Sequence, residues 1–458
     1  MKYRLRISGR DAQNIKNHLF PGDQLEAVSI AMCGHHKGKE EFILCVHEVF
    51  NIPYEKCDRT PGYVHWQTET IIPFIEKAAK LGLSIVKLHS HPGGYDSFSE
   101  LDDASDKKLF PSLYGWIDGE QPHASIVVLP NGRFFGRIVD SSGGFHVVDQ
   151  IMIVGDTISI FNHIEEEVDQ KVSLRNIQSF GPGTTRLLKN IAVGVVGASG
   201  TGSPILEQLS RLGVGELVII DPDIIEDKNL NRILNSKKHH ATQKVYKANM
   251  LKTSIEAMGF NTKVFSFTEN LYDSRDAIDA LIRCDVIFGC VDSIDGRHLL
   301  SQISTFYCIP YIDIGIKLEA DGRGGINQIN GAVHYIQPGG SSLLSRGVYS
   351  IQGLESATLK RENKEEYEKR LKEKYIVNIR VDSPAVISVN MFVSSFGVND
   401  FLNRIHPYKG YNPSERAVTW LSLSEDMIFH DSDGTPDVYL GKKVGLGDYK
   451  PFLDIPGL

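Results

Sequence analysis

Three runs of strand length between residues 191 and 290 constrain the fold of the chain more than any other feature. The runs are Ile191–Val196, Glu216–Ile220 and Asp285–Cys290, and segments with helical spacing separate them. Strands that alternate with helices along a chain pair in parallel, and a parallel sheet is covered by helices on both faces. The sequence therefore predicts a doubly wound, Rossmann-like α/β domain around these runs.

A second α/β block precedes this one. Residues 71–81 place apolar side chains at helical spacing, and residues 83–88 follow as an apolar run of strand length. The chain of 458 residues is also too long for a single domain of about 150 residues. We predict four segments: a first α/β domain at 1–150, a linker with a connecting helix at 151–183, the doubly wound domain at 184–410, and an extension that packs on it at 411–458.

Composition excludes several classes of partner. A net charge of −8 and a pI near 6.1 provide no basic surface for nucleic acid. No stretch approaches the roughly 18 consecutive apolar residues of a membrane span, and the start of the sequence lacks the apolar core of a secretory signal. We therefore expect a cytoplasmic protein without nucleic acid or membrane partners, whose six scattered cysteines are reduced.

A candidate metal site follows the strand predicted at residues 83–88. His89 and His91 stand at positions i and i+2, so an extended chain projects them to one side, and Asp102 comes a short loop later. Two histidines and one carboxylate can hold Zn²⁺ with a fourth position open. Zinc lowers the pKa of a bound water to about 7, which suits amide hydrolysis at neutral pH.

The run His89-x-His91-Pro, six residues, Ser99, two residues, Asp102 resembles the signature of the JAMM (MPN) zinc metalloproteases at every defined position. The resemblance implies an α/β metalloprotease domain of the isopeptidase type. It also implies that Glu26 is the general base, with Glu48 as a less favoured substitute, and that Ser99 steadies the oxyanion of the tetrahedral intermediate.

The first strand of the second block leads into a glycine turn. Gly197, Gly200 and Gly202 follow Val196 and precede a predicted helix, and the next strand ends at Asp221. Free backbone N–H groups at such a turn favour phosphate, and an acidic residue at the end of the second strand can hold a nucleotide ribose. A nicotinamide dehydrogenase would give the same outline, so the turn by itself leaves the nucleotide open.

The residues that follow the glycine turn favour one class of nucleotide-binding enzyme. The chain runs Asp221-Pro-Asp-Ile-Ile-Glu-Asp-Lys-Asn229-Leu-Asn-Arg232, then Lys244, then Cys-Val-Asp292. This order closely resembles the ubiquitin-activating and sulfur-carrier-activating (ThiF-like) adenylyltransferases over roughly residues 175–404. The match implies an ATP-dependent adenylating domain that uses Mg²⁺.

The same resemblance assigns roles to single residues. It implies that Asp221 holds the ribose, that Arg232 and Lys244 bind the phosphates, and that Asn229 forms the turn beside them. Asp292 would hold the magnesium ion or the incoming carboxylate. Arg175 would reach across a homodimer interface.

The sequence departs from this family where a cysteine is expected. No cysteine follows Cys308, and Ser342 and Ser345 occupy a C-x-x-C context of related proteins. A serine hydroxyl is a poor nucleophile without a neighbouring base, so a stable thioester on this chain is doubtful. Adenylation itself requires no cysteine.

Together the resemblances imply a bifunctional bacterial enzyme of ubiquitin-like modification, of a kind found in conjugation operons, some linked to antiviral defence. The zinc domain would trim a precursor or cut an isopeptide bond. The second domain would adenylate the C-terminus of a ubiquitin-like (β-grasp) protein for a separate conjugating enzyme. Two alternatives stay open: cysteine-independent adenylation of a peptide or small carboxylate, and a binding scaffold with inactive sites.

Overall fold

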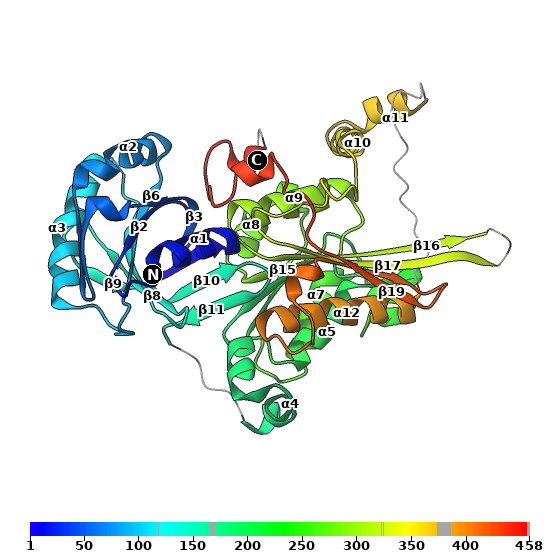
Figure 1. The fold of residues 1–458 in the computed structure, drawn as a ribbon. Coiled ribbons are helices and arrows are strands. Elements are labelled where there is room, and N and C mark those ends of the chain that lie inside the picture. Colours follow the sequence, from blue (N-terminus) through cyan, green and yellow to red (C-terminus); the bar gives the residue numbers. More distant parts are fainter. Residues whose placement is uncertain (118, 165–169, 322, 324, 373–385, 456–458) are drawn as a thin grey trace. The chain divides into compact units, whose positions relative to one another are not determined.

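The computed structural model describes residues 1–458 except 118, 165–169, 322, 324, 373–385 and 456–458 (Figure 1). The chain divides into two compact units. The first unit comprises Met1–Ile164 together with two later segments, Thr305–Cys308 and Lys442–Gly457. The second unit comprises Glu165–Ser304 and Ile309–Gly441.

The first unit is built on a nine-stranded mixed sheet with the order β11-β10-β1-β3-β2-β6-β7-β8-β9. Its central strand β2 pairs antiparallel with β3 and β6, whereas β6 pairs parallel with β7. The elements are β1 (Lys2–Ser8), α1 (Gly9–Leu19), β2 (Val28–Lys37), β3 (Glu41–Asn51), the hairpin β4 (Cys57–Thr60) and β5 (Tyr63–Trp66), α2 (Ile72–Leu81), β6 (Ser84–Ser90), α3 (Glu100–Trp116), β7 (His123–Val128), β8 (Phe134–Val139), β9 (Phe145–Val147), β10 (Gln150–Val154) and β11 (Ile158–Asn162).

Both faces of this sheet are buried, because β2 alternates its side chains between two hydrophobic clusters. Ala31 belongs to the cluster that contains Ile15 of α1. Its neighbour Ile30 belongs to the cluster that contains Ile75 of α2 and Phe110 of α3. Helix α1 therefore covers one face, and α2 and α3 cover the other.

The predicted helix and strand at 71–81 and 83–88 are confirmed as α2 and β6. The predicted domain boundary at residue 150, by contrast, is too early. Strand β10 pairs in parallel with β1, and β11 pairs with β10. Residues up to Asn162 therefore complete the first sheet rather than form part of a linker.

The second unit contains an eight-stranded sheet with the order β14-β13-β12-β15-β16-β17-β18-β19. Its elements are α4 (Gln170–Lys189), β12 (Ala192–Val196), α5 (Gly202–Arg211), β13 (Glu216–Ile220), α6 (Lys238–Thr242), α7 (Lys247–Glu256), β14 (Lys263–Phe267), α8 (Arg275–Ile282), β15 (Val286–Gly289), α9 (Ile294–Phe306), β16 (Tyr311–Ala320), β17 (Ile326–Ile336), α10 (Ile351–Glu362), α11 (Lys364–Lys372), α12 (Ile387–Ile405), β18 (Val418–Ser422) and β19 (Met427–Asp431).

Strands β14, β13, β12, β15 and β16 are parallel, and β17 to β19 continue the sheet in antiparallel fashion. Figure 1 shows α8 and α9 on one face of this sheet and α5, α7 and α12 on the other. The prediction of a doubly wound domain is therefore confirmed. The chain leaves β12 toward β13 and returns on its other side with β15, so the carboxyl end of β12 lies at the switch point where such folds bind ligands.

The C-terminal extension differs from the prediction that it packs wholly on the second domain. Residues up to Gly441 cluster with the second unit, but Lys442–Gly457 cluster with the first. The cause is a close backbone approach: the Gly34 amide donates to the Gly445 carbonyl at 2.9 Å, and a Cβ on Gly34 would stand 2.2 Å from the Leu446 carbonyl carbon. His36 also contacts Asp448, with 3.1 Å between Nδ1 and Oδ1.

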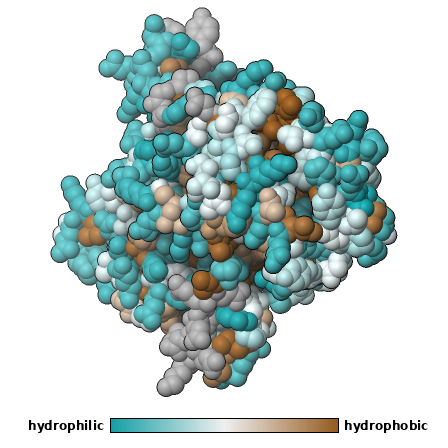
Figure 2. Space-filling model, turned by 90° about the vertical axis from the view of Figure 1, so that its left-hand side faces the viewer, coloured by the Kyte–Doolittle hydropathy of each residue, from teal (hydrophilic) through white to brown (hydrophobic). Residues whose placement is uncertain are grey.

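The surface offers no large apolar face in the view of Figure 2, where hydrophobic residues are scattered among hydrophilic ones. Single exposed apolar side chains of this kind are normal on folded proteins. None of the described helices combines the length and the apolar character that crossing a membrane requires.

Candidate functional site

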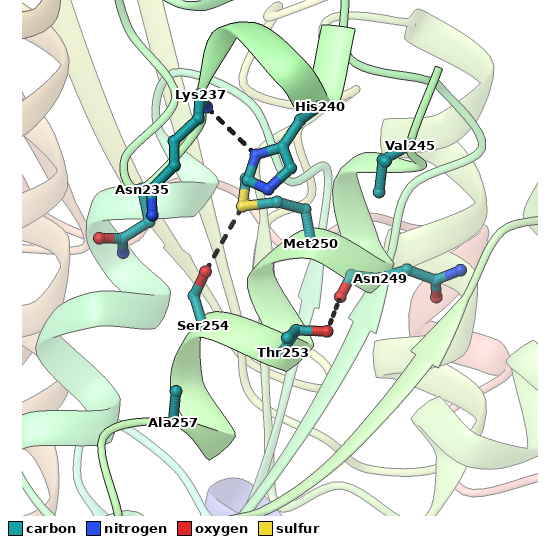
Figure 3. A pocket seen from close by; sticks show the side chains of 9 residues that line it. All are labelled: Asn235, Lys237, His240, Val245, Asn249, Met250, Thr253, Ser254 and Ala257. Carbon is teal, nitrogen blue, oxygen red and sulfur yellow. Dashed lines mark hydrogen bonds between the residues drawn. The ribbon is translucent and has the colours of Figure 1, made fainter. Parts of the chain in front are cut away.

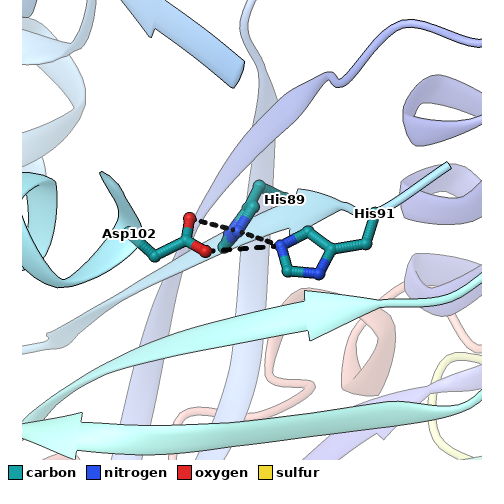
Figure 4. A group of neighbouring side chains, drawn as sticks. All are labelled: His89, His91 and Asp102. Atoms are coloured by element: carbon teal, nitrogen blue, oxygen red, sulfur yellow. Dashed lines mark hydrogen bonds and ion pairs between the residues drawn. The ribbon is translucent and has the colours of Figure 1, made fainter. Parts of the chain in front are cut away.

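His89, His91 and Asp102 converge in the first unit (Figure 4). The ligand atoms of the three residues all lie within 4.8 Å of one another. Nε2 of His89 lies 2.9 Å from Oδ1 of Asp102, and Nε2 of His91 lies 3.4 Å from Oδ2. The two Nε2 atoms are 3.2 Å apart. The structure thus brings together the three residues that the sequence predicted as metal ligands.

The chemistry of these donors fits zinc. Nδ1 of His91 faces the Tyr95 carbonyl at 2.7 Å, so it carries the proton and leaves the Nε2 lone pair facing Asp102. Burial lowers the pKa of His89, which favours its neutral, ligating form. Tetrahedral ligands at about 2.0–2.2 Å from zinc lie roughly 3.3–3.6 Å apart, close to the spacings observed here.

Helix α3 positions the carboxylate. Ser99 is its N-cap, and the Ser99 hydroxyl accepts from the Asp102 amide at 3.1 Å while the Ser99 amide donates to Oδ2 of Asp102 at 2.8 Å. The Ser99 hydroxyl also donates to Oδ2 at 2.7 Å. Burial alone would raise the pKa of Asp102, but the bonds from His89, His91 and the Ser99 amide together lower it. Ser99 therefore holds Asp102, and its predicted role at an oxyanion stays a prediction.

The pairing of β2 with β6 brings Glu26 close to the three candidate ligands. Val28 lies opposite His89, the Ser90 amide donates to the Ala27 carbonyl at 3.1 Å, and the Ala27 amide donates to the Ser90 hydroxyl at 2.9 Å. This register places Glu26 near His91. Its side chain is buried, and burial raises the pKa of Glu26 to about 7. Glu26 precedes β2 rather than lying within a strand. Glu48 instead forms an ion pair with Lys77.

The glycine turn of the second unit follows β12, at the switch point of its sheet. Gly197 has a φ of +92°, and a Cβ there would stand 2.4 Å from the Cys290 carbonyl oxygen. A Cβ on Gly202, the first residue of α5, would stand 1.8 Å from the Gly197 carbonyl oxygen. Only glycine allows this backbone to fold so tightly.

Asp221 anchors that turn from the end of β13. Its buried carboxylate accepts from the Ala198 amide at 2.6 Å and from the Asp223 amide at 2.9 Å. Burial raises the pKa of Asp221, and the nearby ammonium of Lys247 opposes that shift. The residue predicted to hold a ribose thus also shapes the turn.

Lys247 is the functional candidate that the sequence analysis missed. It begins α7, is buried, and places Nζ 2.7 Å from Oδ2 of Asp223 and 3.8 Å from Oδ1 of Asp221. The predicted Lys244 lies instead on an exposed turn with a φ of +52°. The sequence does contain a signal for this residue. Ala248 and Leu251 are spaced as on the buried face of a helix, and Lys247 begins that helix.

The other predicted residues surround the same edge of the sheet. A Cβ on Gly200 would lie 3.4 Å from Cδ of Arg232, whose guanidinium donates to the Lys228 carbonyl at 2.7 Å. Buried Asn229 accepts from the Glu226 amide at 2.9 Å and so caps the turn before Arg232. Asp292 is exposed in the segment that follows β15.

Arg175 lies apart from that edge. It is exposed on α4 and donates to Gln178 at 3.1 Å. Its action across a homodimer interface stays a prediction.

Cys290 and Cys308 are the last two cysteines of the chain and precede the serine pair Ser342 and Ser345. Burial raises the pKa of Cys290 to about 12 and that of Cys308 well above its usual value. Ser342 donates to Oδ2 of Asp437 at 2.5 Å, and its hydroxyl accepts from the Ser345 amide at 3.1 Å. The buried Ser342 hydroxyl is therefore engaged in structural hydrogen bonds.

A pocket of about 420 Å³ lies beside α7 (Figure 3). The polar groups that line it bond one another: Nδ1 of His240 accepts from the Lys237 amide, and Ser254 bonds the sulfur of Met250. None of its lining residues is a predicted site residue, and we assign it no chemistry.

Comparison with known proteins identifies the second unit. The family model described as "ThiF family" matches residues 173–405, which is more than half of the chain. The chain belongs to the ThiF family. This match begins after the first sheet has ended, so the resemblance of the first unit to JAMM metalloproteases stays a prediction.

Several curated proteins are similar to part of the ThiF chain. "Adenylyltransferase and sulfurtransferase MOCS3" of Caenorhabditis briggsae is 30% identical over 147 residues, or 32% of this chain and 36% of the relative. "Ubiquitin-like modifier-activating enzyme 5" of Dictyostelium discoideum is 26% identical over 186 residues, or 38% of this chain and 46% of the relative. The chain therefore spans less than half of the length of these relatives.

Solved structures similar to this ThiF chain include MccB of E. coli with the peptide "MccA-N7isoASN". That chain has a TM-score of 0.45 and 17% sequence identity, with 59% of this chain and 76% of the other covered. The structure titled "SeMet PaaA" has a TM-score of 0.42 and 20% identity, with 59% of this chain and 85% of the other covered.

Proposed function

We propose that the second unit uses Mg²⁺ and ATP to adenylate a carboxylate. The observation that carries the proposal is the glycine turn at the switch point, anchored by Asp221 and flanked by Arg232 and Lys247. Backbone amides at such a turn bind phosphate, and two cations neutralise charge that develops while the α-phosphate is attacked. Asp292, at the same edge of the sheet, would bind Mg²⁺ or orient the carboxylate.

The preferred substrate is the C-terminal carboxylate of a ubiquitin-like β-grasp protein, which a separate conjugating enzyme then accepts. Two of the similar proteins, an adenylyltransferase and a ubiquitin-like modifier-activating enzyme, support this choice. A homodimer, with Arg175 reaching the partner's site, belongs to the same proposal.

For the first unit we propose zinc-dependent cleavage of the peptide or isopeptide bond that follows the same C-terminal tail. His89, His91 and Asp102 would hold the ion, which supplies Lewis-acid activation of water at neutral pH. Ser99 orients Asp102, and Glu26, which is close to His91 and Asp102, would accept and return a proton. The tautomer that Tyr95 imposes on His91 supports this role.

One observation favours a second candidate substrate for adenylation, a peptide or small carboxylate that needs no thioester. Ser342 and Ser345 are engaged with each other and with Asp437, and the high pKa of Cys290 leaves that thiol unreactive. An acyl adenylate formed here would then pass directly to an external nucleophile.

ATP–pyrophosphate exchange tests the proposal and separates the substrates. Purified protein with Mg-ATP is assayed with a ubiquitin-like protein ending in a free carboxylate, with the same protein amidated at its C-terminus, and with short peptides. Exchange with the first alone supports ubiquitin-like activation, and exchange with peptides supports the second candidate. No exchange with any carboxylate would contradict adenylation and leave the binding scaffold.

A further inference from the structure

Asn390 of α12 carries a buried donor that the protein itself does not use. Only 3% of the residue is exposed, and within the part of the chain that the structure describes its Nδ2 meets no hydrogen-bond partner. A buried amide left unpaired is costly, and native proteins pair most such groups. An unpaired amide that lines a ligand site therefore points to an acceptor supplied by the ligand.

The neighbours of this amide belong to the glycine turn. A Cβ on Gly200 would lie only 2.2 Å from Nδ2 of Asn390 and 3.4 Å from Cδ of Arg232. Both side chains therefore stand over the same face of Gly200. One helical turn further along α12, the Ser394 hydroxyl donates to the Thr201 carbonyl at 2.9 Å, which fixes the helix against the turn.

We propose that Asn390 is a nucleotide-binding residue, whose Nδ2 donates a hydrogen bond to a phosphate oxygen of the ATP held at the glycine turn. This inference rests on the proposed adenylation. Phosphate is the ligand group that the backbone amides of the turn and the Arg232 side chain both select. The motif residues named above end at Asp292, so α12 would contribute from a later segment of the same family match.

Three variants test the role. Asn390→Leu keeps the size of the side chain and removes its donors, whereas Asn390→Asp replaces the donors with a negative charge. Asn399→Asp is the matched control, because Asn399 lies on the same helix but is exposed. Affinities for ATP and for adenosine, which has no phosphate, are measured by calorimetry and by competition.

We expect Asn390→Leu to weaken ATP binding about 10-fold and Asn390→Asp about 100-fold, because hydrogen bonds to charged groups are strong. Adenosine binding and the control should change less than about twofold. The nucleotide-free Asn390→Leu protein should melt at the same or a higher temperature than the wild type, since an unpaired buried donor is lost. A purely structural asparagine would lower that temperature instead.

Four results would overturn the inference. If both Asn390 variants bind ATP within twofold of wild type, Asn390 donates no hydrogen bond to the nucleotide. If the variants lose equal affinity for ATP and for adenosine, the acceptor of that bond is not a phosphate. An Asn390→Leu protein that unfolds, together with normal ATP binding by Asn390→Asp, shows a structural role. A wild-type chain that binds no ATP overturns the proposed adenylation as well.

Discussion

The two candidate sites differ in how much of their geometry the protein completes by itself. In the first unit the three donor side chains already contact one another, and Ser99 and Tyr95 fix two of them. In the second unit a backbone turn and a buried carboxylate are fixed, but Asn390 lacks an acceptor. If both sites act as proposed, zinc binding would depend on each of a few ligands, whereas nucleotide binding would be spread over many groups.

The largest effect is expected at the candidate metal site of the first unit. His89→Ala removes one of three ligands and should weaken zinc binding at pH 7 by at least about 1,000-fold, because little else holds the ion. Competition with a chromogenic chelator measures this affinity. The control is His65→Ala, which removes an exposed histidine of the same unit. Equal zinc affinity of both variants would break the comparison.

The next effect separates two neighbouring lysines. Lys247→Ala should lower ATP–pyrophosphate exchange about 10²–10³-fold, as loss of a positioned charge does in phosphoryl chemistry. Lys244→Ala, at an exposed position, should change it less than about twofold. The reverse ranking would restore the role that the sequence assigned to Lys244.

These lysines show why the sequence predicts the first site better. His89, His91 and Asp102 lie on one strand end and one helix start, so local spacing places them together. Lys244 and Lys247 are three residues apart, and only the start of α7 decides which of them points inward. The contact of Gly34 with Leu446 joins segments that no motif connects, so the extension was misplaced. Asn390 was missed for the same reason.

A smaller effect is expected for the backbone of the glycine turn. Gly197→Ala should lower the free energy of unfolding by about 2–3 kcal/mol, because the new Cβ meets a positive φ and the Cys290 carbonyl. Gly213→Ala is the matched control: its φ is +82°, but a Cβ there meets nothing within 4 Å. It should cost only about 1 kcal/mol in urea unfolding. Equal losses of unfolding free energy in the two variants would mean that the contact of the new Cβ with the Cys290 carbonyl does not destabilise the protein.

The smallest effect concerns acid stability of the second sheet. Burial lowers the pKa of His334 to about 3, while an unfolded chain binds the proton below about 6.5. The unfolded state then holds more protons, so stability falls as pH drops from 6.5 toward 3, by up to about 1.4 kcal/mol per unit. His334→Phe should flatten this dependence in urea unfolding at pH 7 and 5. A slope unchanged by His334→Phe contradicts the assignment.

The most direct test of two separate sites is one crossed measurement. Zinc content and ATP–pyrophosphate exchange are determined on the same preparations of wild type, His89→Ala and Lys247→Ala. We predict that His89→Ala loses zinc and keeps exchange, and that Lys247→Ala keeps zinc and loses exchange. Wild-type protein that binds no zinc, or exchange that falls equally in both variants, would contradict the account.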